Sequence, residues 1–245
     1  MYLVPQSSGF IIWLTGMKKA GKSTLAAQLA QRLALIGKPV QLLDEDGEAK
    51  FLIEGYGTSK EDHAAVVKRF GYVAKAVAKA GGVAICSALS PYRDAREVLR
   101  KEARRFVEVF VDAPMETLLH RDGKEALYKR ALASEIQGVA GVDLPYEPPA
   151  HPELVLHTDQ EPVEGSLLRI LQVLVDGKFL TPAEFGTLSG GQKPRRRSAR
   201  AEKPAKAGHA TRGKPARAAK AKPAASKAGA RKAPKKAAAR TARRR

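Results

Sequence analysis

The sequence predicts an α/β protein built on a five-stranded, mostly parallel sheet with helices on both faces, followed by a disordered basic tail. Two patterns indicate this fold class. Along residues 1–180, short runs of β-branched and aromatic residues alternate with segments whose apolar residues recur at helical spacing, as expected for parallel strands joined by covering helices. Residues 193–245 contain no Val, Ile, Leu, Met, Phe, Tyr or Trp, so that segment has nothing with which to build a core.

The predicted elements follow one another from the start of the chain. The first strand is expected at "GFIIWLTG", where apolar residues run from Phe10 and Gly16 ends the strand. A helix should then run over residues 21–35 and end before Gly37, because its apolar residues keep helical spacing up to that point. Further strands are predicted at 40–46, 82–90, 106–114 and 153–159, and further helices at 61–80, 93–105 and 163–175.

Polar residues gather where the predicted strands end. Gly16, Asp44, Asp112 and residues 87–92 all close a strand, and parallel sheets carry their ligand sites at these carboxyl ends. The segment 120–149, between the fourth and fifth strands, is long and rich in charge, Gly and Pro. We expect it to form a mobile lid over the site.

The first strand leads into a phosphate-binding loop. "GMKKAGKS" fits the pattern G-x-x-x-x-G-K-[ST], and it has the strand before it and the helix after it that the pattern requires. Its glycines let backbone N–H groups turn toward phosphate oxygens, and the helix N-terminus adds partial positive charge. Lys22 should reach the β- and γ-phosphates of ATP, and the Ser23 hydroxyl should ligate Mg²⁺. The residues predicted to bind ATP in this loop are Gly16, Met17, Lys18, Lys19, Ala20, Gly21, Lys22, Ser23 and Thr24.

Two carboxylates follow the second strand, in "LLDEDG". Asp44 and Asp46 stand at the predicted carboxyl end of that strand. Such carboxylates can hold Mg²⁺, as predicted for Asp44 together with Ser23, or accept a proton from an attacking hydroxyl. A solvated acidic turn before Gly47 is the alternative, and the neighbouring phosphate loop favours chemistry over it.

Other features of the composition exclude several classes of protein. A single cysteine, Cys86, cannot form an intramolecular disulfide, and no apolar run is long enough to span a bilayer. The first residues lack the basic start and apolar stretch of a signal peptide. The five histidines show no metal-ligand spacing. We therefore expect a cytoplasmic protein without a membrane partner, and its oligomeric state is left open, a homodimer included.

The ordered motifs of residues 10–159 resemble those of the adenylylsulfate kinase family. The resemblance rests on "GMKKAGKSTLA", "LLDED", "SALSPYRDARE", "FVEVFVDAPMETLLHRD", "ALYKRALASEI" and "GVDLPYEPP". It implies a P-loop kinase domain at 1–180 that transfers the γ-phosphoryl of ATP, with Mg²⁺, to the ribose 3′-hydroxyl of adenosine 5′-phosphosulfate. The residues that match the family's functional positions are Lys22, Asp44 and Asp46, Ser90 (in the family sometimes described as a phosphoserine intermediate), Arg121 near the adenine, and Lys129 in a basic motif of the lid.

The acceptor side of the sequence departs from the family pattern. Thr58 and Val139 stand where the family has aromatic residues that stack on the substrate adenine, and Val66 replaces an asparagine. His63 replaces an arginine that binds the phosphosulfate, and Lys50 follows the aspartates where the family has Asn-Val-Arg. Each lost stacking contact is worth about 1–3 kcal/mol, and each lost charged hydrogen bond about as much.

These losses predict a changed acceptor. Lys50 can replace an arginine only as a point charge, and His63 only when protonated. We expect a hydroxyl acceptor smaller or less anionic than adenosine 5′-phosphosulfate. The candidate substrate contacts are Lys50, His63, Ser90, Tyr92 and Lys129, with Tyr92 either in the site or packed against it.

The tail, residues 193–245, concentrates the charge of the chain. It holds 21 of the 44 Lys and Arg residues and one of the 25 acidic residues, and residues 181–192 are predicted to link it to the kinase domain. Its composition resembles that of linker-histone tails, and such a charge block favours non-specific nucleic-acid binding. A solubilising tail is the alternative for this segment. For the whole protein, the alternative to a kinase is a nucleic-acid-associated nucleotide-binding pseudoenzyme or sensor module.

Overall fold

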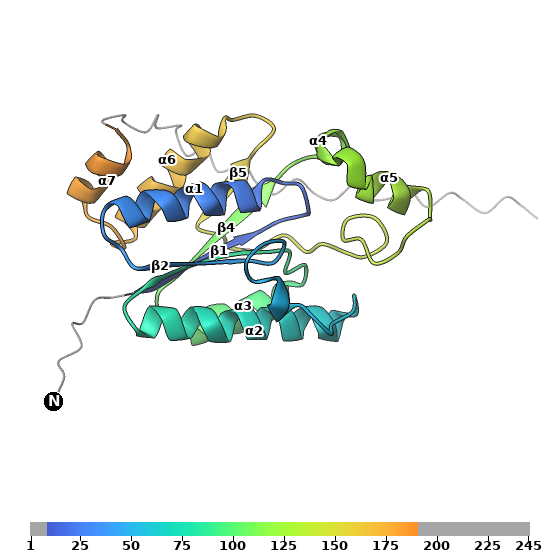
Figure 1. Ribbon diagram of the computed structural model, residues 1–245, viewed down its shortest axis with the longest axis horizontal. Helices are drawn as coiled ribbons and strands as arrows, with labels where there is room; N and C mark the ends of the chain where they lie inside the picture. Colours follow the sequence, from blue (N-terminus) through green and yellow to red (C-terminus); the bar gives the residue numbers. More distant parts are fainter. Residues whose placement is uncertain (1–8, 191–245) are drawn as a thin grey trace, which may run out of the picture. The chain divides into compact units, whose positions relative to one another are not determined.

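The computed structural model describes residues 9–190 and confirms the predicted α/β fold (Figure 1). Five strands form one sheet in the order β2-β3-β1-β4-β5, and every neighbouring pair is parallel. This order places β1 at the centre of the sheet, so the segment that follows β1 lies between the ends of its neighbours. The strands are β1 (Phe10–Thr15), β2 (Val40–Asp44), β3 (Val83–Ala88), β4 (Phe106–Asp112) and β5 (Leu154–His157).

The register of the sheet brings the predicted site residues to one edge. Thr15, the last residue of β1, pairs with Ala88 of β3 and Phe110 of β4. Asp44, the last residue of β2, pairs with Ser87. The segments that follow β1, β2 and β3 therefore leave the sheet at the same edge, which is where such sheets hold ligands.

Two apolar layers hold the helices on the sheet. Leu14 of β1 belongs to the core beneath α1, together with Leu29, whereas its neighbour Trp13 faces the other side and packs against Phe70 of α2. This alternation is what a strand buried on both faces requires. One face carries α1 (Lys22–Leu35), α6 (Val163–Asp176) and α7 (Pro182–Leu188), and the other carries α2 (Lys60–Lys79) and α3 (Arg93–Glu102) (Figure 1).

The segment predicted as a lid forms short helices rather than one long loop. It contains the end of α4 (Met115–Arg121), a 3₁₀ turn (Gly123–Glu125) and α5 (Leu127–Leu132). Buried Asp122 joins these pieces, because its carboxylate accepts hydrogen bonds from the backbone N–H groups of Tyr128, at 2.8 Å, and Lys129, at 3.3 Å.

The range predicted as a linker, 181–192, differs from the structure over its described part. Pro182–Leu188 form helix α7, and Thr181 and Glu184 make a reciprocal capping box at its start. Leu188 is buried in the core, and Lys38 forms an ion pair of 2.7 Å with Glu184. Residues 181–188 therefore belong to the folded body, because they form a capped helix that buries Leu188 in the core.

The predicted tail, 193–245, lies outside the described residues. Between residues 9 and 190, no helix combines the length and the apolarity that a membrane crossing requires.

Candidate active site

The phosphate loop, residues 16–23, depends on glycine at two positions. A Cβ on Gly16 would lie 2.1 Å from the carbonyl oxygen of Val111, so only glycine fits between β1 and β4. Gly21 has φ of 106°, a left-handed conformation, immediately before α1 begins at Lys22. The loop consequently ends at the N-terminus of a 14-residue helix, as an anion-binding loop does.

Lys22 is a buried cation folded over this loop. Its ammonium donates hydrogen bonds to the carbonyl oxygens of Gly16, at 2.9 Å, and Met17, at 3.1 Å. Burial lowers the pKa of Lys22, and the neighbouring Glu45 carboxylate opposes that shift. The positive charge is therefore held where the phosphates of a nucleotide would meet the loop.

Ser23 and Asp44 come together at the end of the sheet. The Ser23 hydroxyl donates a hydrogen bond of 3.1 Å to Asp44 Oδ1, and Asp44 is buried. Both are oxygen donors, which Mg²⁺ prefers, and Mg²⁺ takes its remaining ligands from water and substrate phosphates. Two protein oxygens therefore fit a Mg²⁺ that is shared with a nucleotide. No cluster of three or more His, Cys, Asp or Glu side chains that could hold a metal is found within residues 9–190.

Asp46 lies beyond Asp44 and is paired with the loop. Its Oδ1 accepts a hydrogen bond from Lys18 Nζ at 3.0 Å, and 49% of its side chain is exposed. The carboxylate can therefore be reached from solvent, and Lys18 holds one of its two oxygens. The structure thus brings Asp44 and Asp46 to the loop, as the sequence predicts.

Glu45, between these two aspartates, is a site residue that the sequence analysis missed. It is 6% exposed, and its Oε1 accepts a hydrogen bond of 2.7 Å from the backbone N–H of Leu89. Burial raises the pKa of Glu45, and the nearby Lys22 ammonium acts in the opposite direction. A charged residue directly after an apolar strand was the available signal, but the sequence alone does not tell that its side chain turns inward.

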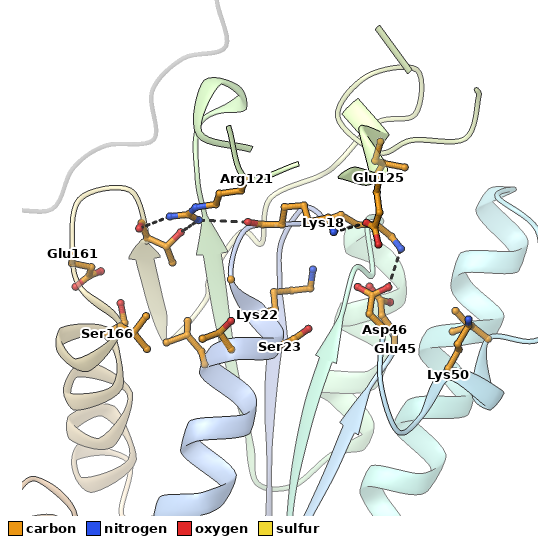
Figure 2. A pocket seen from close by; sticks show the side chains of 18 of the residues that line it. Lys18, Lys22, Ser23, Glu45, Asp46, Lys50, Arg121, Glu125, Glu161 and Ser166 are labelled. Carbon is orange, nitrogen blue, oxygen red and sulfur yellow. Dashed lines mark hydrogen bonds and ion pairs between the residues drawn. The ribbon is translucent and has the colours of Figure 1, made fainter. Parts of the chain in front are cut away.

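A cavity of about 940 Å³ joins these groups (Figure 2). It runs from the turn after β2, where Glu45, Asp46 and Lys50 line it, past the phosphate loop to Ser166 at the start of α6. Glu125 and Arg130 line it from the lid. Ser166 is buried, and its hydroxyl has no hydrogen-bond partner among residues 9–190.

Arg121 lines the cavity and is held by Thr158. It donates to the Thr158 hydroxyl at 2.9 Å and to the Thr158 carbonyl at 2.8 Å, and Thr158 in turn donates to the Ala20 carbonyl at 2.8 Å. The lid meets the phosphate loop at two further points. The Tyr128 hydroxyl donates to the Lys18 carbonyl at 2.9 Å, and Lys19 forms an ion pair with Glu125.

Ser90, which the sequence analysis predicts to be catalytic, does not line the cavity. It is 4% exposed and is not among the residues that line the cavity. Its hydroxyl accepts a hydrogen bond of 3.1 Å from Trp13 Nε1 and donates one of 2.9 Å to Thr15 Oγ1. The hydroxyl is therefore committed to holding the loop after β3 against β1, and we assign it that structural role.

The residues predicted to contact the substrate do not all line the cavity. Lys50 lines the cavity, whereas His63 and buried Tyr92 face each other with ring centroids 5.9 Å apart. Burial lowers the pKa of His63, and its Nε2 has no partner in the described chain. Lys129 is exposed and does not line the cavity, and its neighbour Arg130 does so instead.

The two positions that lack an aromatic residue lie close together. Thr58 approaches the lid so tightly that a Cβ on Gly138 would lie 2.7 Å from its methyl group. Val139, the next residue, is buried in the apolar core. Neither Thr58 nor Val139 carries a ring that could stack on a base.

A buried arginine, which the sequence analysis also missed, organises the loops behind the site. Arg96 is 1% exposed, donates to Glu108 Oε1 at 3.0 Å, and also donates to the carbonyl oxygens of Ser90 and Glu147. It therefore joins the loop after β3 to the end of the lid segment. Its sequence, in "DAREV", does not distinguish it from the exposed arginines of the same helix.

The fold and this loop define the class of protein. A parallel sheet with a phosphate loop after its central strand, a Ser–Asp pair at the helix start and a charged lid is the architecture of a P-loop phosphotransferase. The family model for adenylylsulphate kinase matches residues 8–157. The chain belongs to the adenylylsulphate kinase family and is an ATP-dependent kinase.

Named relatives and solved structures agree with this assignment. The chain is 41% identical over 174 residues to the adenylyl-sulfate kinase of Picosynechococcus sp., covering 71% of this chain and 98% of that one. It is 46% identical over 167 residues to a probable bifunctional SAT/APS kinase 2 of Sorangium cellulosum, covering 68% of this chain but only 29% of that longer protein. A structure of the Mycobacterium tuberculosis APS kinase CysC, in complex with AMPPNP and APS, superposes with a TM-score of 0.64 at 32% identity, covering 68% of this chain and 98% of that one. These likenesses favour the kinase over the pseudoenzyme or sensor.

Proposed function

We propose that this kinase transfers the γ-phosphoryl of Mg²⁺-bound ATP to a hydroxyl group of a small acceptor. The observation that carries the proposal is the Ser23–Asp44 hydrogen bond of 3.1 Å beside buried Lys22, at the mouth of one cavity. Ser23 and Asp44 would hold the metal, which supplies positive charge to the phosphates when bound. Lys22 would neutralise charge on the transferring group. Asp46 would orient the acceptor hydroxyl and take its proton.

The lid and the start of α6 would hold the nucleoside part of ATP. Arg121, fixed on Thr158, offers a planar cation of the kind that stacks on a base. Tyr128 and Glu125 tie the lid to the phosphate loop, which supports closure of the lid over bound phosphates.

We propose further that the acceptor is smaller or less anionic than adenylyl sulfate. Thr58 and Val139 offer no ring for an adenine, and burial keeps the pKa of His63 low, so that its ring is uncharged at neutral pH. Lys50 and Lys18 line the cavity together with the carboxylates of Glu45 and Asp46. Two ammonium groups that share this region with two carboxylates favour a neutral or weakly anionic acceptor.

The test is ADP release from Mg-ATP by the full chain, with and without adenylyl sulfate, beside Lys22→Ala. We expect ATP to bind, and micromolar adenylyl sulfate to leave the rate unchanged. A panel of polyhydroxylated neutral compounds should then include one that accepts labelled phosphoryl. Stimulation by adenylyl sulfate that Lys22→Ala abolishes would refute the changed acceptor. Full acceptor phosphorylation by Lys22→Ala would refute the assigned nucleotide site.

We also propose that the basic tail, residues 193–245, attaches the kinase to nucleic acid. The support is its 21 Lys and Arg residues against one acidic residue, since such charge binds phosphate backbones by releasing counterions. Without an aromatic residue it should bind without sequence preference. Retention on DNA at low salt should disappear when residues 193–245 are deleted, and equal retention of the truncated chain would contradict the proposal.

A further inference from the structure

Ser166, near the start of α6, carries a buried hydroxyl without a hydrogen-bond partner in the described chain. The residue is 1% exposed, and its Oγ makes no hydrogen bond to any group within residues 9–190. A serine inside a helix often donates its hydroxyl proton to the carbonyl oxygen four residues earlier. Here the Pro162 carbonyl accepts the backbone N–H of Ser166, at 3.1 Å, and not the hydroxyl. Because an unsatisfied buried hydroxyl lowers stability, Ser166 calls for a partner that a ligand supplies.

Ser166 lines the cavity of the phosphate loop, at the end formed by α6. Figure 2 shows Ser166 on one side of Lys22 and Asp46 on the other. The Ser166 oxygen points from the helix toward the side on which Glu161 and Arg121 lie, and both of these residues also line the cavity (Figure 2). The hydroxyl is therefore placed for a part of the ligand that lies away from the acceptor carboxylate.

The surroundings of Ser166 suit a nucleobase. Leu25 and Val163 supply apolar lining from α1 and α6, and Arg121, held by the Thr158 hydroxyl at 2.9 Å, supplies a planar cation. Bases stack on guanidinium planes, and ligand pockets are mostly apolar with a few polar groups that fix the orientation of the ligand. Since a hydroxyl both donates and accepts, Ser166 can bond to a ring nitrogen or to the amino group of adenine.

We propose that Ser166 is a specificity-determining residue of this kinase and that its hydroxyl forms a hydrogen bond to the adenine of ATP. The phosphates would contact the loop around Lys22, and the base would satisfy the buried hydroxyl at the other end of the nucleotide. The inference rests on the proposed nucleotide site and goes further by naming the side chain that contacts the base.

The experiment measures the binding of Mg-AMPPNP to the full chain by calorimetry, beside Ser166→Ala. One net hydrogen bond corresponds to about a 2- to 10-fold change in affinity, so Ser166→Ala should bind AMPPNP more weakly by about that factor. Its melting temperature should stay unchanged or rise, because the variant loses no hydrogen bond within the described chain. Ser189→Ala is the matched control, because Ser189 is also buried but donates to the Gly186 carbonyl at 3.3 Å and does not line the cavity. Its affinity for AMPPNP should equal that of the unchanged chain.

Ribose 5-triphosphate, which carries the sugar and the phosphates without a base, separates the base from the rest of the nucleotide. Its affinity should be the same for Ser166→Ala and for the unchanged chain, and an equal loss for both probes would overturn the contact with the base. Unchanged AMPPNP affinity in Ser166→Ala would also overturn the inference, as would a melting temperature below that of the unchanged chain. If the unchanged chain binds neither probe, the proposed function is refuted, and this inference with it.

Discussion

Replacing Arg96 by methionine should destabilise the protein more than any exposed arginine replacement in the same helix. Methionine keeps most of the apolar stem but removes every donor of the guanidinium. The carbonyl oxygens of Ser90 and Glu147 each lose a donor, at about 1–3 kcal/mol for each buried group. Glu108 would still form its ion pair of 3.0 Å with Arg100, which limits the free energy lost when Arg96 is replaced. Breaking a buried pair typically costs about 3–5 kcal/mol, and we expect the free energy of unfolding to fall by about that amount.

Urea denaturation of the full chain, followed by circular dichroism, measures this loss. For a protein of this size, each kcal/mol corresponds to about 2–4 °C in melting temperature, so thermal melting should show a fall of roughly 6–20 °C. Arg93→Met is the control, because Arg93 lies in the same helix, is exposed, and also donates to a backbone carbonyl, that of Pro148. If Arg96→Met costs no more than Arg93→Met, the buried hydrogen bonds do not hold these loops together and the reasoning is refuted.

Three further outcomes follow from individual side chains. Ser90→Ala should lower the free energy of unfolding by about 1–3 kcal/mol, because the buried Trp13 N–H loses its acceptor. Turnover per folded molecule should stay unchanged, and a loss of turnover would support a catalytic role for Ser90. Tyr128→Phe removes the hydroxyl that donates to the Lys18 carbonyl, so steady-state kinetics should give a higher KM for ATP with an unchanged melting temperature. If the KM for ATP does not rise, this contact has no role in nucleotide binding. Burial raises the pKa of the Cys86 thiol, so iodoacetamide at pH 8 should label Cys86 only after the chain is unfolded in urea. Mass spectrometry measures the labelling, and labelling of the native chain would contradict the burial of Cys86.

The parts of the fold that the sequence predicts correctly are those set by local patterns. The strand Phe10–Thr15 is a continuous apolar run and the helix Lys22–Leu35 has apolar residues at helical spacing, and the glycines of the loop mark the turn between them. The loop and the carboxylates after β2 are close in the sequence to the elements that place them. Helix Pro182–Leu188 lies in the range that the sequence predicts as linker, because one or two helical turns have too few apolar positions to show a period.

The errors at the site arise from contacts between distant parts of the chain. Ser90 bonds to Thr15, 75 residues away, so nothing in "SALSPY" indicates whether its hydroxyl faces the cavity or the sheet. Lys129 and Arg130 are adjacent on a helix, where successive side chains point about 100° apart, and tertiary packing turns Arg130 rather than Lys129 to the cavity. Glu45 was missed for the same reason, since its side chain is held by the Leu89 N–H from the loop after β3.

The three lysines of the phosphate loop all contact acceptor groups of the protein itself, and this affects how nucleotide binding should be interpreted. Lys18 pairs with Asp46, Lys19 with Glu125, and Lys22 with carbonyl oxygens of its own loop. The first two are surface ion pairs worth about 0–1 kcal/mol each, so phosphates can displace them at little cost. Their release frees a carboxylate on each side of the loop, Asp46 toward the acceptor and Glu125 on the lid. We therefore expect ATP binding to release Asp46 and Glu125 from these ion pairs together, which would leave Asp46 free for the proposed contact with the acceptor hydroxyl once a phosphoryl group is bound.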